Sequence, residues 1–339
     1  MIHTILITHR IDYIGLYNSI FKNLETLSKN HGLNFYKTNE GYITNALKEE
    51  GFTEILLSKF KINPRYKHDY MQLTIQLNPT KLLNKDITEL TKEKDLEEVE
   101  KRFNEIIDNQ VHSELETFFY WILNRIDYAV NIPTPYVKEY IKLFQRTEIP
   151  HSFKIPYDKE SKVRKHKEGS LYLFNKSVRI NFYDKENERL NNDEVVESAK
   201  NILRLEVQCL KNKTNSLKKK YNFDAKILGN YLSEEKSTEQ LVNYYYKTIG
   251  TGDFYKLDKA IEIINNSKAT PGTKEKLINV LEEVNKARSI WKAKENTSYS
   301  EDSFKRYLKQ IRELGVNPAT IPRRWSIEKL DSINIYNYM

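Results

Sequence analysis

Hydrophobic and polar positions follow two different periods along the first third of the chain. Residues 1–11 and 70–77 place apolar side chains at alternate or continuous positions, which predicts β-strands. Residues 14–28 repeat apolar side chains at helical spacing, and the charged stretch 86–107 also favours a helix. This part of the chain is therefore predicted to interleave strands with helices.

Between residues 124 and 208, three short apolar segments each contain a polar side chain that chemistry could use. The segments are residues 124–130, 178–185 and 203–208. A helical pattern at residues 136–145 and a strand pattern at residues 170–174 lie between the first and second of them. The resulting order, strand–helix–strand–strand–helix–strand with local reversals, predicts an α+β fold on an antiparallel sheet.

Beyond the last of these segments, strand patterns end and lysine-rich helical periodicity replaces them. Pro271 is well placed to begin a helix, because its fixed φ angle suits the first helical position. Gly315 follows the helical stretch 303–314 and fits a left-handed C-terminal cap. The sequence therefore predicts an α+β domain over residues 1–215 and an all-α C-terminal domain over residues 216–339.

Composition narrows the class of protein. The chain is basic, with a formal net charge of +8 and a pI near 9.1, which favours an anionic partner such as a nucleic acid. Its mean hydropathy of -0.69 and the lack of any run of roughly 18 apolar residues predict a soluble, cytoplasmic protein without a membrane partner. Cys209 is the single cysteine, which excludes an intrachain disulfide framework and a cysteine-based zinc site.

Two of the three segments carry a carboxylate inside an otherwise apolar strand pattern. Asp127 lies in the first segment and Glu206 lies in the third. A carboxylate at such a position is costly to bury unless it is paired or bound to a metal, and two together suit Mg²⁺ or Mn²⁺. The alternative interpretation is structural, with Asp127 either in an ion pair with Arg125 or facing solvent.

The second segment carries a tyrosine that could act as a nucleophile. Lys185 follows Tyr183 by two positions, so an extended strand would place both side chains on one face. The ammonium group would then stabilise a phenolate or the charge that develops on a phosphate. Tyr172 is a competing nucleophile, and spacing alone does not choose between the two tyrosines. A tyrosine near two metal-binding carboxylates points to an enzyme that nicks DNA.

Basic residues cluster near these segments and are predicted to contact a DNA backbone. They are Lys162, Arg164, Lys165 and Lys167, with further lysines in residues 211–220. Arg125 or Arg204 would position phosphates. For residues 218–220, a solvated helix face is an equally good interpretation. Glycine-rich nucleotide-binding motifs and the serine-hydrolase motif are absent from the sequence.

Taken in order, the segments resemble the gene II/X-type replication initiators of filamentous phages and their relatives on plasmids and prophages of Gram-positive bacteria. The matching pieces are Met1-Ile2-His3-Thr4-Ile5, residues 73–77 running into Asn78-Pro79-Thr80-Lys81-Leu82-Leu83, Arg125-Ile126-Asp127, Tyr183-Asp184-Lys185, Leu203-Arg204-Leu205-Glu206, and Leu314-Gly315-Val316-Asn317-Pro318-Ala319-Thr320-Ile321-Pro322. These pieces are scattered over nearly the whole chain, and their order and spacing carry the resemblance.

The resemblance implies a rolling-circle replication initiator with an antiparallel-sheet nicking domain similar to that of the HUH superfamily. Such an enzyme nicks one strand of a replication origin, joins a tyrosine to the 5′ phosphate and leaves a free 3′ hydroxyl. The family's nucleophile matches Tyr183 and its strand lysine matches Lys185. In the similar staphylococcal plasmid initiators, the tyrosine would fall on Tyr172. The His-hydrophobic-His motif of the wider superfamily is missing here.

The same resemblance implies a set of partners. The substrate would be origin DNA that is double-stranded, locally melted or folded as a hairpin, and host polymerase and helicase would act on the product. The C-terminal helices would bind the origin, contact the helicase or form a homodimer.

Two interpretations without catalysis stay open at the sequence level. The chain could be a sequence-specific DNA-binding regulator in which the helix near residues 303–314 enters a groove. It could also be an RNA-binding protein that uses a basic, tyrosine-rich surface. An enzyme needs Asp127, Glu206 and a tyrosine close together, whereas a pure binding protein does not.

Overall fold

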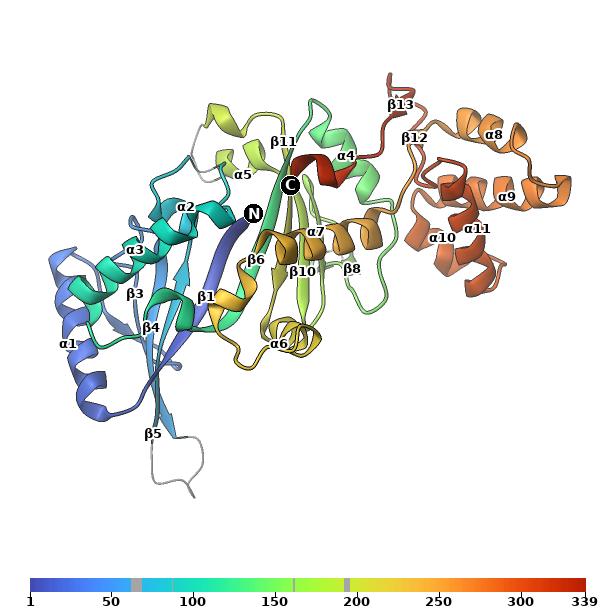
Figure 1. Cartoon of the computed structure of the whole chain (residues 1–339). Helices are drawn as coiled ribbons and strands as arrows, with labels where there is room; N and C mark the ends of the chain where they lie inside the picture. Colours follow the sequence, from blue (N-terminus) through green and yellow to red (C-terminus); the bar gives the residue numbers. More distant parts are fainter. Residues whose placement is uncertain (62–68, 87, 161, 192–195) are drawn as a thin grey trace. The chain divides into compact units, whose positions relative to one another are not determined.

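A computed structural model describes residues 1–61, 69–86, 88–160, 162–191 and 196–339 of the chain (Figure 1). Within these residues the fold is α+β, as predicted, and its largest element is a nine-stranded sheet in the order β2-β3-β4-β5-β1-β6-β11-β10-β9. Its strands are β1 (Ile2–Ile11), β2 (Tyr36–Lys37), β3 (Tyr42–Thr44), β4 (Phe52–Lys61), β5 (Asp69–Leu77), β6 (Ile122–Pro133), β9 (Ser170–Phe174), β10 (Val178–Asp184) and β11 (Ile202–Cys209). Two small ladders pair β7 (Tyr157–Asp158) with β8 (Val163–Arg164), and β12 (Phe254–Tyr255) with β13 (Lys329–Leu330).

Helices connect these strands and make up most of the last third of the chain. The α-helices are α1 (Ile14–Asn30), α2 (Pro79–Leu82), α3 (Leu96–Ile106), α4 (Val137–Phe144), α5 (Lys185–Leu190), α6 (Lys211–Lys220), α7 (Glu234–Ile249), α8 (Leu257–Asn265), α9 (Pro271–Ala287), α10 (Ile290–Asn296) and α11 (Glu301–Glu313). Short helical turns are η1 (Glu93–Asp95), η2 (Ile107–Val111), η3 (Phe118–Tyr120), η4 (Glu197–Ala199), η5 (Leu228–Tyr231) and η6 (Ile335–Tyr338). Among the described helices, none combines the length and the apolar character that a membrane span requires.

The chain divides into two compact units, and both are discontinuous in the sequence. Unit 1 comprises residues 1–130, 176–179 and 206–240, and unit 2 comprises residues 131–175, 180–205 and 241–339. The boundary that the sequence predicted at residue 215 stays a prediction.

In unit 1, β1 lies between β5 and β6 and is antiparallel to both. Ile7 of β1 faces Ile75 of β5, and Thr4 of β1 faces Asp127 of β6. A bulge interrupts the pairing of β1 with β6 between Ile2 and Thr4. The predicted strands at residues 1–11 and 70–77 and the predicted helix that follows the first of them are confirmed.

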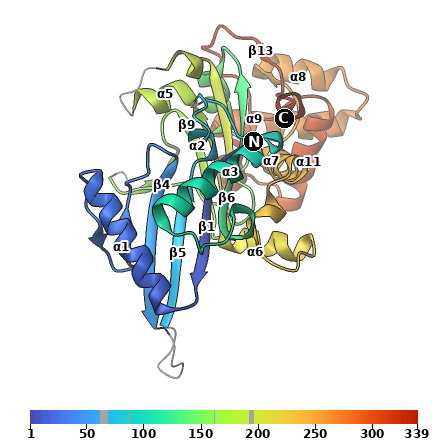
Figure 2. The same cartoon turned by 60° about the vertical axis from the view of Figure 1, so that its left-hand side comes forward.

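One face of this sheet is apolar and forms the core of unit 1. Side chains from β1, β4, β5 and β6 are buried on it, and they are Ile5, Ile7, Ile55, Leu57, Leu73, Ile75, Leu123 and Ile126. Helix α1 buries Leu16, Ile20 and Leu24, and Phe103 of α3 stacks on Phe52 with ring centroids 5.5 Å apart. Both helices lie in front of the strands in Figure 2. Burial of this apolar surface supplies the main stabilising term of the unit.

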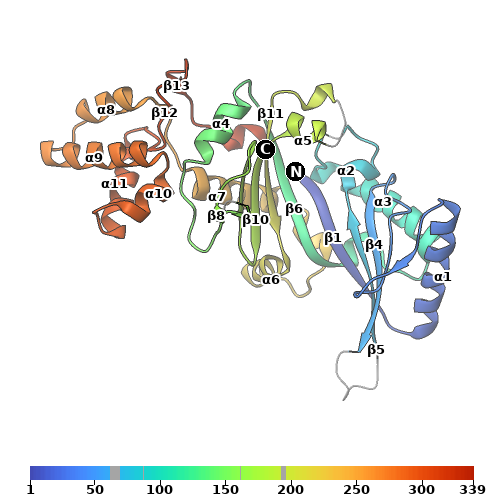
Figure 3. The same ribbon diagram turned by 180° about the vertical axis from the view of Figure 1, so that it is seen from behind.

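The opposite face of the same strands is polar. Because side chains alternate along a strand, the register places β1, β5 and β6 residues together on this face: Thr4, Leu6, Thr8 and Arg10, then Tyr70, Gln72, Thr74 and Gln76, then Arg125 and Asp127. Thr8 contacts Thr74 at 3.0 Å and accepts a hydrogen bond from Asn124 at 2.6 Å. We call the surface formed by these residues the polar sheet face. In Figure 3 the sheet is seen with α3 behind the strands.

Unit 2 has its own aromatic core. Phe144 of α4 packs edge-on against Phe182 of β10, with ring centroids 5.1 Å apart, and also contacts Tyr245 of α7 and Phe254 of β12. The core therefore joins strands of the middle of the chain to its last third. Helices α8, α10 and α11 all contact α9. Pro271 begins α9 and Gly315 follows α11 with φ +79, as predicted.

Candidate functional site

Asp127 is the most deeply buried carboxylate of the polar sheet face. Its side chain is 1% exposed, and Arg125 on the same strand donates hydrogen bonds to both of its oxygens: Nε to Oδ1 at 2.9 Å and to Oδ2 at 3.1 Å, and Nη2 to Oδ2 at 2.8 Å. The two residues are neighbours on one face because they are two positions apart in an extended strand. The ion pair that formed the alternative interpretation of Asp127 is therefore present.

Glu206 of β11 is the second buried carboxylate of unit 1. Its Oε2 lies 3.6 Å from Nδ1 of His3, and its Oε1 accepts a hydrogen bond of 2.7 Å from Nε2 of Gln208. His3 sits in the β1 bulge next to Thr4, whose hydroxyl contacts His3 Nδ1 at 3.2 Å. A histidine and an amide side chain thus contact the carboxylate of Glu206.

The two carboxylates influence each other electrostatically. Burial is the main cause that raises the pKa of Asp127 to about 7; the charge of Glu206 adds to the rise, and Arg125 and Arg179 oppose it. Arg179 is the exposed second residue of β10. A buried acid whose pKa lies near neutrality, beside a second acid, is typical of functional sites. That Asp127 and Glu206 act together at one metal stays a prediction.

The side chains of this site that could bind a hard cation are the carboxylates of Asp127 and Glu206. Among the described residues, no group of three or more His, Cys, Asp or Glu side chains is arranged to hold a metal ion. Mg²⁺ binds to proteins through only one or two carboxylates and completes its shell with water and substrate phosphate. Asp127 and Glu206 would supply the two carboxylates, and Arg125 would share the Asp127 carboxylate with the ion.

In unit 2, Tyr183 and Lys185 lie at the end of β10, but not in the geometry that the sequence predicted. The strand ends at Asp184, whose carboxylate accepts hydrogen bonds from the backbone N–H groups of Glu186 and Asn187. Asp184 is thus the N-cap of α5, and Lys185 is the first residue of that helix rather than part of the strand. The shared strand face predicted for Tyr183 and Lys185 is wrong. The two side chains are still neighbours, since Lys185 Nζ lies 6.0 Å from the centroid of the Tyr183 ring.

Lys185 is a buried cation. Its side chain is 1% exposed, and its Nζ donates a hydrogen bond of 2.7 Å to Glu188, which also pairs with Arg189. Burial is the main cause that lowers the pKa of Lys185 to about 8; the nearby Arg204 adds to this effect, and Glu188 opposes it. Lys185 therefore stays mostly protonated at neutral pH beside Tyr183, but it loses its proton more readily than an exposed lysine does.

Arg204 is too deeply buried to contact a DNA backbone. Its side chain is fully buried, and its Nε donates a hydrogen bond of 2.7 Å to Oδ1 of Asn131. This burial argues against the phosphate contact predicted for Arg204 and gives the residue a structural role. Arg125 remains partly exposed, at 21% of its side chain.

The competing nucleophile, Tyr172, lies on β9 at the end of the sheet order. It is half-buried, and its ring stacks on that of Phe174 with centroids 5.8 Å apart. Tyr183 is more enclosed, with 8% of its surface exposed. The choice between the two tyrosines stays open.

The four basic residues predicted to contact DNA lie on or beside the β7–β8 hairpin and are all exposed. Lys165 pairs with Asp158 at 2.7 Å, and Arg164 donates to the backbone carbonyl of Ile155 at 2.8 Å. No such ion pair is described for Lys162 or Lys167 within the residues that the structure covers. We call this element the basic hairpin.

Sequence reasoning missed two members of the Glu206 cluster. His3 reaches the cluster through the bulge in β1, and a bulge has no clear signature in a single sequence. Gln208 could have been found, because it lies two positions after Glu206 in a strand and must share its face.

Comparisons with known proteins do not assign the chain to a family. A scan against models of known protein families finds no match, and a search of curated proteins finds no related sequence. The resemblance to rolling-circle initiators therefore rests on the residues that carry it.

Proposed function

We propose that the protein initiates rolling-circle DNA replication by nicking one strand of an origin through a tyrosine transesterification. Its α+β architecture would then be that of an HUH-like nicking domain, with the last third of the chain as a mainly helical part that also carries the small β12–β13 ladder. The supporting observation is the pair of buried carboxylates, Asp127 with Arg125 beside it and Glu206 with His3 beside it. Burying two acids together is costly, and a site that binds a cation and a phosphate explains the cost.

The reaction assigns a role to each side chain. The phenolic oxygen of Tyr183 gives up its proton and forms a bond to phosphorus, the bond between phosphorus and the 3′ oxygen breaks, and one proton is returned to that oxygen. Lys185 assists with charge beside the tyrosine, and Arg125 positions a phosphate. Asp127 and Glu206 would hold Mg²⁺ or Mn²⁺, which when bound would polarise the scissile phosphate. Because the phosphotyrosine bond conserves the energy of the bond that was cut, the reverse reaction rejoins DNA without ATP.

Incubation with a pool of supercoiled plasmids carrying candidate origins, with Mg²⁺ or Mn²⁺, tests this proposal. Gel electrophoresis reports nicked circles, and peptide mass spectrometry identifies the residue joined to DNA. We expect a tyrosine peptide with a covalent nucleotide. Tight binding without any nick under either metal contradicts the proposal.

Two variants separate the candidate nucleophiles. Tyr183→Phe is expected to abolish the covalent adduct and to leave duplex binding nearly unchanged. Tyr172→Phe serves as the matched variant, because it removes the competing hydroxyl from the other strand. If Tyr183→Phe forms adduct at the wild-type yield and Tyr172→Phe does not, Tyr172 is the nucleophile.

A non-catalytic, sequence-specific DNA-binding regulator is the second candidate function. The ion pair of Arg125 with Asp127 favours this second function, since Arg125 donates hydrogen bonds to both carboxylate oxygens and no metal is needed to satisfy them. Binding of an origin with no nick, and with unchanged affinity after addition of a chelator, would support this second function.

A further inference from the structure

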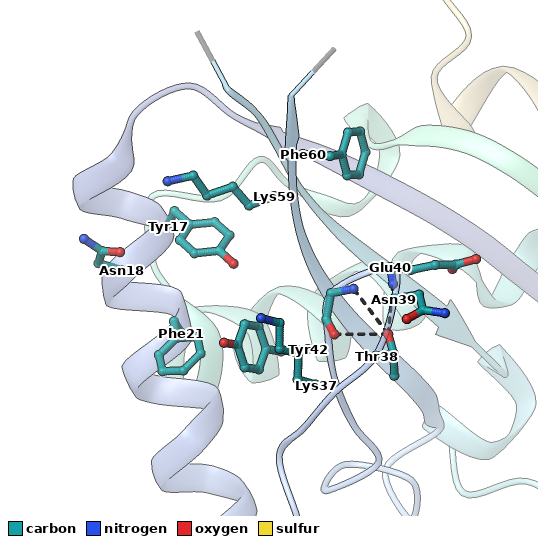
Figure 4. A pocket seen from close by; sticks show the side chains of 11 residues that line it. Tyr17, Asn18, Phe21, Lys37, Thr38, Asn39, Glu40, Tyr42, Lys59 and Phe60 are labelled. Atoms are coloured by element: carbon teal, nitrogen blue, oxygen red, sulfur yellow. Dashed lines mark hydrogen bonds between the residues drawn. The ribbon is translucent and has the colours of Figure 1, made fainter. Parts of the chain in front are cut away.

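A pocket of about 530 Å³ lies in unit 1 between α1, the β2–β3 hairpin and the end of β4. Its volume falls within the range of sites that take a single small ligand. Figure 4 shows Tyr17 and Phe21 on the α1 side, Lys37 and Tyr42 on the hairpin side, and Lys59 with Phe60 at one end. Neither the acid pair nor the basic hairpin contributes to this pocket.

Aromatic rings dominate the wall of the pocket. Phe21 and Tyr42 meet edge to face, with ring centroids 4.8 Å apart. Phe60 is 43% exposed at the end of the pocket and stacks on Tyr70, with centroids 5.3 Å apart. Rings fixed in this way leave faces on which a flat ligand can stack without losing much side-chain freedom.

Two cations accompany the rings. Lys59 Nζ lies 5.9 Å from the centroid of the Tyr17 ring, and Lys37 projects from the hairpin; both lysines are exposed. Asn39 and Glu40 add an amide and a hydrogen-bond acceptor at the hairpin turn. Rings, cations and a few polar groups together match a nucleotide, which is a flat base joined to a phosphate.

Backbone geometry holds the hairpin close to β4. Gly41 has φ +152, and a Cβ atom added there would lie 2.2 Å from the carbonyl oxygen of Leu57. The Thr38 hydroxyl contacts both the N–H and the carbonyl oxygen of Gly41, at 3.2 Å and 3.1 Å. The wall that carries Lys37 and Tyr42 is therefore formed in advance of any ligand.

The pocket also connects to the polar sheet face. Phe60 lines the pocket, and Tyr70, on which it stacks, belongs to that face. Arg10 extends the contact, with its guanidinium carbon 5.9 Å from the centroid of the Tyr70 ring. Asp127 lies on the same face of the sheet, so a flexible strand of DNA could follow the face and turn into the pocket at Phe60.

We propose that this pocket binds one unpaired nucleotide of single-stranded DNA, with the base against Tyr17, Phe21 and Tyr42 and the phosphate near Lys37 and Lys59. The inference rests on the proposed function, because melting or nicking of an origin supplies the single strand. Phe60 and Tyr70 stack the neighbouring base and lead the strand toward the polar sheet face. A duplex does not fit this role, because its bases are stacked on each other and present no free face.

Fluorescence anisotropy with the full chain tests the proposal. The probes are a labelled oligothymidylate of about ten nucleotides, a length that one single-strand-binding site covers, and a duplex of the same length. Phe60→Ala and Lys59→Ala are expected to weaken binding of the single strand about tenfold each and to leave duplex binding unchanged. Both side chains are exposed, so neither change removes core packing.

Matched controls remove the same residue types elsewhere. Tyr336→Ala removes an aromatic ring that is 58% exposed, and Lys29→Ala removes a lysine that is 70% exposed. Both are expected to bind the single strand like the wild type. Wild-type single-strand affinity in Phe60→Ala and Lys59→Ala overturns the proposal. Competition by free thymidine monophosphate at an affinity equal to that of the oligonucleotide also overturns it, since the pocket would then take free nucleotides.

Nicking and single-strand binding are measured separately, so failure of one is distinct from failure of the other. If the wild type nicks an origin and Phe60→Ala keeps its single-strand affinity, only the pocket assignment fails. If the wild type never nicks but the pocket variants lose single-strand affinity, the pocket assignment stands and the proposed function fails.

Discussion

Asp127 in unit 1 and Lys185 in unit 2 are both buried charged residues with charged neighbours, and they differ in the element that carries them. Asp127 lies inside a strand, where the register fixes its face and Arg125 shares that face. Lys185 begins a helix, where Asp184 caps the backbone and Glu188 approaches from the next turn. In both places burial moves the pKa toward neutrality, upward for the acid and downward for the base. Two different local structures thus prepare groups that can exchange protons near pH 7.

The most sensitive test of this comparison is removal of the Asp127 charge. Asp127→Asn is expected to abolish metal-dependent nicking, because a neutral amide is a poor ligand for Mg²⁺. It is also expected to make the free energy of unfolding fall less as pH rises, since the buried carboxylate no longer has to ionise. Nicking is read on gels and stability by urea denaturation.

Asp12→Asn is the control for this change, because the Asp12 side chain is 80% exposed. It should alter neither nicking nor stability. Unchanged nicking in Asp127→Asn would remove Asp127 from the metal site and leave the ion pair with Arg125 as its role.

Removal of the Lys185 charge is expected to have the next largest effect. Lys185→Met keeps most of the volume and should slow nicking about 100-fold, the usual loss when a group that stabilises transition-state charge is deleted. Stability at pH 7 should hold or rise, because a buried cation is replaced by an apolar side chain. Lys200→Met, which removes a half-exposed lysine from a comparable pair with Glu197, is the control. Equal nicking rates in the two variants would contradict the assignment of Lys185.

The sequence predicted the strands well where apolar alternation was long, and it placed Asp127 and Glu206 in strands correctly. It did not predict the start of α5, although Asp184 followed by acidic residues is a recognisable helix N-terminus. Because this helix start was missed, Tyr183 and Lys185 were expected to share one face of a longer strand. Burial of Arg204 depends on Asn131, which is 73 positions away, and a contact at that distance leaves no local pattern. The pocket at Tyr42 and Lys59 likewise depends on how a short hairpin packs on α1.

Measuring the free energy of unfolding at a series of pH values compares the two buried charges in one experiment. The pKa of Asp127 rises from 3.8 to about 7 on folding, so the folded state binds the extra proton, and stability should fall as pH rises from about 4 to 7. The pKa of Lys185 falls from 10.5 to about 8, so the unfolded state binds the extra proton, and stability should rise between about pH 8 and 10.5. Urea denaturation across this range should lose the first slope in Asp127→Asn and the second in Lys185→Met. Slopes that persist in both variants would show that other groups cause them.

The basic hairpin offers the smallest effect and compares Lys165, which pairs with Asp158, with Lys167, for which the described residues show no ion pair. Lys167→Ala is expected to lower the salt dependence of duplex binding by about 0.9 in log–log slope, the value for one phosphate contact on duplex DNA. Lys165→Ala should lower it less, because Asp158 already pairs with that lysine at 2.7 Å. Affinities measured from low to physiological salt give both slopes. Equal slopes for the wild type and Lys167→Ala would mean that the hairpin does not contact the duplex, which would leave the polar sheet face and the C-terminal helices to bind it.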